Sequence, residues 1–163
     1  MGTTRRLERV MLVQPNVSWS GKRTWKLIPY NLGLLNASLK QAGYESWIFD
    51  PNLDNLPEEA VREEFRRTQP DAVGITTFST EYLQEPRLIS RLAREELPEA
   101  TVILGGVLPT VWLERAAEDP HVDYFVLGEG EYRLGRLLGA LKTGADLSGL
   151  DGLAYGSPAV VGS

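Results

Sequence analysis

The residues best suited to chemistry in this sequence are small or hydroxylic, and they follow short apolar runs. Three loops are rich in such residues. The candidate site residues of these loops are Thr76, Thr77 and Ser79, then Gly105, Gly106, Val107 and Pro109, then Gly128, Glu129 and Gly130. Small residues let a bulky ligand approach the backbone, and hydroxyls with free N–H groups at helix starts suit phosphate and amide groups. The pattern predicts a site that holds a ligand, and we assign no catalytic residue.

The sequence lacks the residues that most catalytic and metal sites need. It contains no cysteine, which excludes disulfides, thiolate metal sites and a cysteine-held iron–sulfur cluster within this chain. The one histidine, His121, precedes the last predicted strand, so a Ser-His-Asp triad is not expected and a structural role is the better interpretation. Arg133 stands where a dinucleotide fingerprint has its third glycine. We predict no metal ligands in this chain.

Each loop also has a purely structural interpretation, which the sequence leaves open. Gly105-Gly106 could be only a tight turn out of a strand. The loop from residue 128 to 131 could be a turn followed by a helix start, where acidic side chains are favourable. Trp19 and Trp25, in the long loop after the first apolar run, could simply cover an edge of the sheet.

The elements that must position these loops alternate between short apolar strands and amphipathic helices. We expect strands at residues 10–13, 47–49, 72–76, 101–104 and 124–127. Between and after them we expect helices at residues 31–42, 57–68, 83–97, 110–117 and 134–143. Asn31 and Thr110 are the expected caps of their helices, and Gly43 and Gly144 are the expected helix ends. Strands rich in Val, Ile and Leu without alternation are typical of parallel sheets covered on both faces.

The predicted fold class is therefore α/β and doubly wound, with a five-stranded parallel sheet of flavodoxin-like or Rossmann-like type. Right-handed crossovers through the helices favour the strand order 2-1-3-4-5. Ligands of such folds bind outside the carboxyl ends of the strands. Because the three small-residue loops follow the third, fourth and fifth strands, all three should meet at that edge.

Length and charge restrict the kind of protein. A chain of 163 residues fits one domain, and we assign residues 1–146 to it, with the Gly- and Ser-richer residues 147–163 as a linker or one more hairpin. A net charge of −5 argues against a nucleic-acid surface and against a polybasic membrane patch. The sequence has no apolar run long enough for a membrane helix, and the absence of cysteine suits the cytoplasm.

An ordered series of motifs resembles one known family. Its members lie at residues 29–35, 42–45, 70–76, 102–106 and 122–131. The series resembles the B12-binding domain in front of class B radical SAM enzymes, a group that includes methylases and the anaerobic magnesium-protoporphyrin ester cyclase type. The resemblance covers roughly residues 9–155, and Gly105-Gly106 and the Gly-Glu-Gly-Glu of residues 128–131 carry most of it.

The resemblance implies a cobalamin lying across the carboxyl edge of the sheet, with its nucleotide tail between the sheet and the helices. The members of the three loops would line that tail, and Trp19, Trp25 or Lys26 would lie near the lower face of the corrin. The B12 domains of methionine synthase and the mutases carry Asp-x-His-x-x-Gly after the first strand, whereas residues 14–30 contain no histidine. The implied cobalamin is therefore His-off.

The resemblance also implies a larger parent enzyme. A radical SAM domain needs three cysteines for a [4Fe-4S] cluster and a barrel for S-adenosylmethionine, and this chain supplies neither. We expect the corrinoid to be the ligand of this chain and a radical SAM domain to follow in cis, in a parent that performs methyl transfer or cyclase-type chemistry; a stand-alone corrinoid carrier is the other possibility. The alternatives are a flavodoxin-like module for a nucleotide or flavin, and a non-catalytic docking domain.

Overall fold

The computed structural model describes residues 6–21, 26, 28–155 and 160–161. The strands are β1 (Arg9–Val13), β2 (Glu45–Phe49), β3 (Ala72–Thr77), β4 (Thr101–Gly106), β5 (Tyr124–Val126), β6 (Leu153–Tyr155) and β7 (Val160–Val161). The helices are α1 (Tyr30–Gln41), α2 (Glu58–Thr68), α3 (Gln84–Glu96), α4 (Val107–Val111), α5 (Leu113–Ala116) and α6 (Gly130–Thr143), and a short 3-10 helix, η1, spans Val17–Ser20.

The strands form one sheet in the order β2-β1-β3-β4-β5-β6-β7. The first five are parallel, which confirms the doubly wound α/β class and the order 2-1-3-4-5. The expected count of five strands is too low, because β6 and β7 extend the sheet in antiparallel pairings. Strand β6 is only three residues long, so its sequence shows no alternation, and pairing with β5 is what makes it a strand.

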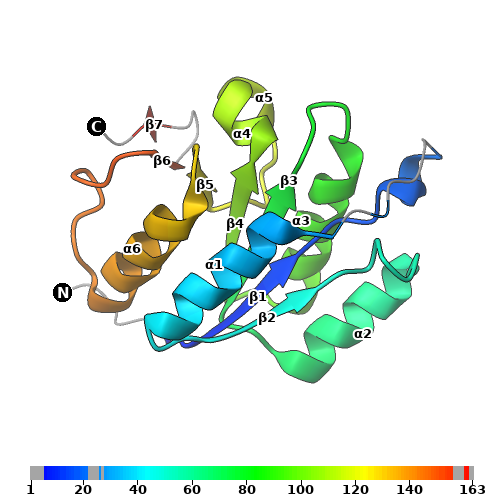
Figure 1. Ribbon diagram of the computed structural model, residues 1–163, viewed down its shortest axis with the longest axis horizontal. Coiled ribbons are helices and arrows are strands. Elements are labelled where there is room, and N and C mark those ends of the chain that lie inside the picture. Colours follow the sequence, from blue (N-terminus) through cyan, green and yellow to red (C-terminus); the bar gives the residue numbers. More distant parts are fainter. Residues whose placement is uncertain (1–5, 22–25, 27, 156–159, 162–163) are drawn as a thin grey trace.

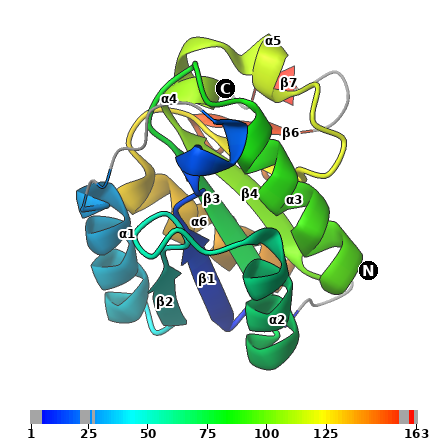
Figure 2. The same cartoon turned by 90° about the vertical axis from the view of Figure 1, so that its right-hand side faces the viewer.

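Helices cover both faces of this sheet. Figure 1 shows α1 and α6 in front of the strands, and Figure 2 shows α1 on the side opposite α2 and α3. Side chains alternate accordingly along β1, where Val10 and Leu12 belong to the core under α1 and α6. Met11 and Val13 belong to the core under α2 and α3. All four are essentially inaccessible to solvent, so the sheet is buried on both faces.

Most predicted helix ends agree with the structure, and two do not. Gly43 (φ +90°) and Gly144 (φ +70°) follow α1 and α6 in left-handed conformation, as the sequence predicts. Asn31 lies inside the first turn of α1 instead of capping it. The helix expected from residue 110 is two short helices, because Trp112 has a non-helical backbone conformation (φ −145°, ψ 66°) and separates them.

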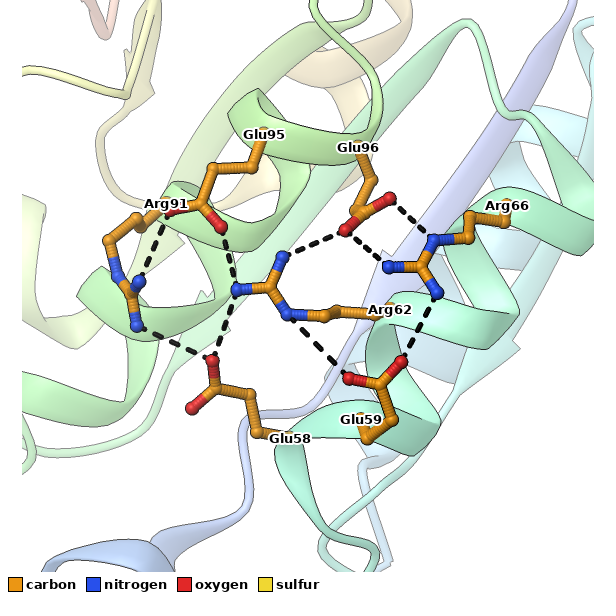
Figure 3. Close-up of polar contacts among 7 residues, drawn as sticks. All are labelled: Glu58, Glu59, Arg62, Arg66, Arg91, Glu95 and Glu96. Carbon is orange, nitrogen blue, oxygen red and sulfur yellow. Dashed lines mark hydrogen bonds and ion pairs between the residues drawn. The ribbon is translucent and has the colours of Figure 1, made fainter.

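An ion-pair network joins α2 to α3 on the outer surface (Figure 3). Arg62 contacts Glu95 Oε2 at 2.7 Å and Glu96 Oε1 at 2.8 Å. Arg66 Nε approaches Glu96 Oε2 to 2.7 Å, so one carboxylate connects two arginines of the neighbouring helix. None of the helices that the structure describes is long and apolar enough to cross a membrane.

Candidate functional site

A cavity of about 500 Å³ lies between the sheet and helices α1 and α6, at the carboxyl ends of β3, β4 and β5. Its volume is typical of small-molecule sites, which run from roughly 300 to 1,000 Å³. The strand order places this edge beside the switch point between β1 and β3, where successive strands are added on opposite sides of the sheet. The cavity is therefore in the position where the fold class binds ligands.

Three glycines from three elements leave the cavity open. A Cβ at Gly74 of β3 would lie 2.9 Å from Leu12 Cδ2, and one at Gly130 of α6 would lie 3.1 Å from Leu35 Cδ2. A Cβ at Gly105 of β4 would meet nothing closer than a carbonyl oxygen at 3.7 Å. All three line the cavity, so the layer between sheet and helices lacks side chains where other positions of this layer carry Leu, Ile or Val.

The cavity is apolar inside and polar at its mouth. The apolar lining includes Leu12, Leu32, Leu35, Ile103 and Leu134. The polar lining comes from the carboxyl-edge loops and the helix starts, and its members are Asn31, Thr76, Thr77, Thr110, Glu129 and Glu131. An amphipathic ligand that buries an apolar part and leaves polar groups at the edge would match this distribution.

The structure brings together most of the site residues that the sequence predicts. Those that line the cavity are Thr76, Thr77, Gly105, Gly106, Val107, Gly128, Glu129 and Gly130. Ser79 and Pro109 are not among the lining residues, and Ser79 Oγ accepts a hydrogen bond from the Glu81 backbone N–H at 3.2 Å. Trp25 lies outside the described residues.

Trp19 lies away from the cavity. Its indole Nε1 donates to the Leu56 carbonyl at 3.0 Å, and its ring packs on the core beneath α2 and α3. It lines a different surface pocket, which it shares with His121. Asn16 fixes this part of the loop, because its side-chain amide donates to Leu56 O at 3.1 Å and its Oδ1 accepts from Ser18 N at 3.0 Å.

The two threonines of β3 use their hydroxyls differently. Thr77 Oγ1 donates to Gly105 O at 2.8 Å and accepts from Leu108 N at 2.9 Å, so it holds the turn from β4 into α4. Thr76 Oγ1 accepts from Asn31 Nδ2 at 2.8 Å. The Thr76 hydroxyl hydrogen has no acceptor among the described residues. Of the two, Thr76 has the hydroxyl that is available to a ligand.

Thr110 joins the two glycine loops across the cavity mouth. Its Oγ1 donates to Gly106 O at 2.7 Å and accepts from Gly128 N at 2.8 Å. Gly106 (φ +91°) must be glycine for two reasons, since its backbone conformation disfavours side chains and a Cβ would collide with the Thr77 carbonyl. The loops that follow β4 and β5 are thus held in one fixed relation.

Several lining residues escaped the sequence prediction. Gly74 carries a signal, because an isolated glycine inside a strand indicates a close approach of another group. Thr110 and Asn31 look like helix caps in the sequence, and only the structure places their side chains at the cavity. Over the residues that are described, no three His, Asp or Glu side chains are grouped to hold a metal ion.

A doubly wound sheet with a glycine-lined cavity at its carboxyl edge defines a class of ligand-binding α/β domain. The family can be stated more closely from comparison with known sequences. The model of the B12 binding domain family matches residues 21–138, and the chain belongs to this family.

Curated relatives are enzymes much longer than this chain. The chain is 32% identical over 158 residues to the anaerobic magnesium-protoporphyrin IX monomethyl ester cyclase of Rubrivivax gelatinosus, covering 92% of the chain and 28% of the relative. It is 25% identical over 146 residues to the cytidylyl-2-hydroxyethylphosphonate methyltransferase of Streptomyces wedmorensis, covering 78% of the chain and 27% of that enzyme. The chain thus spans less than a third of either relative.

Solved structures agree with this assignment. The radical S-adenosylmethionine methyltransferase TsrM from Kitasatospora setae, with cobalamin and a [4Fe-4S] cluster bound, matches with a TM-score of 0.81 and 26% identity. That match covers 96% of this chain and 31% of TsrM. The cobalamin-dependent S-adenosylmethionine radical enzyme OxsB shares the fold, with a TM-score of 0.72.

Proposed function

We propose that the glycine-lined cavity receives the nucleotide tail of a cobalamin whose corrin ring covers the carboxyl edge of the sheet. The single observation that carries this proposal is the cavity itself. It is open because Gly74, Gly105 and Gly130 have no side chains, and it lies between sheet and helices in a chain of the B12 binding domain family. The polar mouth suits a ligand that carries amides and a phosphate.

The residues at the mouth fit such a ligand. The Thr76 hydroxyl can donate into the cavity, and the carboxylates of Glu129 and Glu131 can accept from amide N–H groups at the rim. Bound cobalamin supplies a cobalt centre that can carry a methyl group. This chain would contribute binding and orientation to the cofactor.

We further propose that the cobalt has no histidine beneath it. The only histidine of the sequence, His121, lies before β5, where Arg94 donates to its backbone carbonyl at 3.1 Å. That position is at the opposite, amino edge of a parallel strand. Electron paramagnetic resonance of cob(II)alamin bound to protein made with 15N-labelled histidine checks this, and an axial-nitrogen splitting that changes with the label would contradict it.

The parent enzyme is also a proposal. The relatives are about three times the length of this chain, and the TsrM structure holds a [4Fe-4S] cluster in addition to cobalamin. We propose that residues 1–146 form the cobalamin domain and that residues 147–163 lead into a radical SAM domain in cis. That domain would hold the cluster and S-adenosylmethionine for methyl transfer or cyclase-type chemistry. A cytoplasmic location is proposed with it.

Corrin retention tests the binding proposal. Protein incubated with hydroxocobalamin and then desalted should keep close to one corrin per chain, measured by visible absorbance. Gly105→Val should lower the retained corrin at least tenfold while the protein stays folded, because the added Cβ has room but the methyl groups enter the cavity.

Gly135→Ala is the matched control for this substitution. It lies in α6, and a Cβ there would meet nothing within 4 Å. This variant should retain corrin as the unmodified protein does. If the unmodified protein keeps no corrin, or if Gly105→Val keeps as much as Gly135→Ala, the cavity is not the cobalamin site.

A further inference from the structure

Arg133 contacts two separate segments beside the cavity. Its Nη1 donates to the carbonyl of Leu127 at 2.9 Å and to that of Glu129 at 3.4 Å. Its Nη2 donates to Asp151 Oδ2 at 3.1 Å. The guanidinium therefore connects the loop between β5 and α6 with the turn before β6.

Two glycines make room for this guanidinium. Gly128 (φ +68°) and Gly152 (φ +67°) are both left-handed, and a Cβ at Gly128 would lie 2.7 Å from Arg133 Nη1. A Cβ at Gly152 would collide with Arg133 Nε. That Nε is buried and has no acceptor among the described residues. The arginine is thus enclosed between two stretches of backbone that only glycine can form here.

The same two stretches are also hydrogen-bonded to each other. The backbone N–H of Leu127 donates to Gly152 O at 2.8 Å, next to the arginine. The three residues that follow Leu127 line the cavity; they are Gly128, Glu129 and Gly130. The backbone N–H of Gly128 donates to Thr110 Oγ1. Any movement of the turn before β6 would therefore be transmitted to the rim through Arg133 and Leu127.

A simple surface ion pair does not account for this arrangement. The Asp151 side chain is 62% exposed, and exposed ion pairs contribute about 0–1 kcal/mol. Two of the three groups that accept from Arg133 are backbone carbonyls of the rim. Both carbonyls accept from Nη1 while Nη2 donates to Asp151, so the planar guanidinium spans the rim and the turn before β6 at once, which the single ammonium group of a lysine cannot do.

We propose that Arg133 is a positioning residue that holds the rim from Leu127 to Gly130 in its cobalamin-binding shape and couples the cavity to strand β6. The inference rests on the proposed function. Coupling between two sites is reciprocal. Cobalamin in the cavity should therefore stabilise the hydrogen bonds of β6. Loss of the arginine should weaken cobalamin binding and should also abolish this effect of cobalamin on β6.

Two measurements on the full chain test this. Titration with hydroxocobalamin, followed by absorbance, gives the dissociation constant, and hydrogen exchange of the Leu153–Tyr155 amides is recorded with and without hydroxocobalamin. Arg133→Met keeps the apolar stem and should raise the dissociation constant about tenfold. Hydroxocobalamin should slow exchange in β6 of the unmodified protein and should have no effect there in the variant.

Two further variants separate the fork from the charge. Arg133→Lys keeps the charge and should bind as weakly as Arg133→Met. Asp151→Asn keeps an oxygen that can accept from Arg133 but removes the negative charge, which Asp151 shares with Arg136 (3.3 Å), and it should change the dissociation constant less than twofold. If Arg133→Met does not fold, Arg133→Lys decides by the same two measurements.

The possible failures are distinguishable. If the unmodified protein binds no hydroxocobalamin, the proposed function fails. If it binds, and the arginine variants match it in dissociation constant or still show cobalamin-dependent protection of β6, the positioning role of Arg133 is overturned while the proposed function stands.

Discussion

At the scale of single residues, the glycines of the edge have two distinct roles. Gly106 and Gly128 are required by the backbone, because both have positive φ and both contact groups that a Cβ would meet. Gly105 is different, since a Cβ would have ordinary contacts there and its φ is not positive. The protein could accommodate a side chain at residue 105, whereas a ligand in the cavity could not.

A buried carboxylate gives a prediction at this scale. Glu85, in the first turn of α3, is 2% exposed, and neither carboxylate oxygen has a partner among the described residues. Leaving such a group unpaired costs about 1–3 kcal/mol. Glu85→Met, of similar length, should therefore raise the free energy of unfolding by about 1–3 kcal/mol in urea titrations.

The exposed Glu99 provides the comparison for Glu85. Glu99→Met should change the free energy of unfolding by less than about 0.5 kcal/mol, because surface substitutions away from special features are nearly neutral. A lower urea midpoint for Glu85→Met than for the unmodified protein would mean that this carboxylate stabilises the fold.

At the scale of elements, helices α2 and α3 depend on charge as well as on apolar packing. Val61 and Phe65 of α2 and Ile89 of α3 are buried in the core that these helices share with the sheet. Outside this core the network of Figure 3 links the helices through Arg62, Arg66 and Glu96. Hydrogen bonds from Arg66 and then Arg62 lower the pKa of Glu96 to about 2.

This lowered pKa predicts the pH dependence of the pairing of α2 with α3. The ordinary pKa of a glutamate carboxyl is 4.5, and the pKa of Glu96 in the folded protein is lower than this. Folding therefore favours the ionised form of Glu96. The stabilisation is complete above pH 4.5 and is lost as the pH falls towards 2. Glu96→Gln should thus lower the melting temperature most near neutral pH. The difference in melting temperature between the variant and the unmodified protein should shrink as the pH falls from 4.5 towards 2.

Glu63 is the matched control on the outer face of α2. It is exposed and has no ion pair with any described residue, so Glu63→Gln should differ little from the unmodified protein at any pH. A melting-temperature difference for Glu96→Gln that stays constant from neutral pH down to acid would rule out the role given to the ionised carboxylate.

At the scale of the whole molecule, the ligand proposed for the cavity would add to the stability of the folded state. A ligand that binds only the folded state, at a free concentration of 100 times its dissociation constant, adds about 2.7 kcal/mol. For a domain of this size, each kcal/mol shifts the melting temperature by roughly 2–4 °C. Hydroxocobalamin should raise the melting temperature by roughly 5–11 °C, as calorimetry can measure.

The same titration on Gly105→Val identifies where the stabilisation originates. The variant should melt at nearly the same temperature with and without hydroxocobalamin, because the valine side chain would occupy part of the cavity where the ligand is proposed to lie. An equal rise in both proteins would place the binding outside the cavity.

The sequence by itself determined the five parallel strands, the helices between them and the edge at which the fold class binds ligands. The runs of Val, Ile and Leu and the helical spacing depend on residues close together in the chain, as do the helix ends at Gly43 and Gly144. The small-residue loops were recognisable for the same reason, because each directly follows a strand.

Only the tertiary structure decided what these parts do together. The cavity depends on Gly74, Gly105 and Gly130, which come from different elements and leave one shared space. Strand β6 exists because β5 offers it hydrogen-bonding partners. Thr77 turns its hydroxyl to the backbone, and Trp19 packs on the other core. Each of these outcomes is set by contacts between residues distant in the chain, which no local pattern encodes.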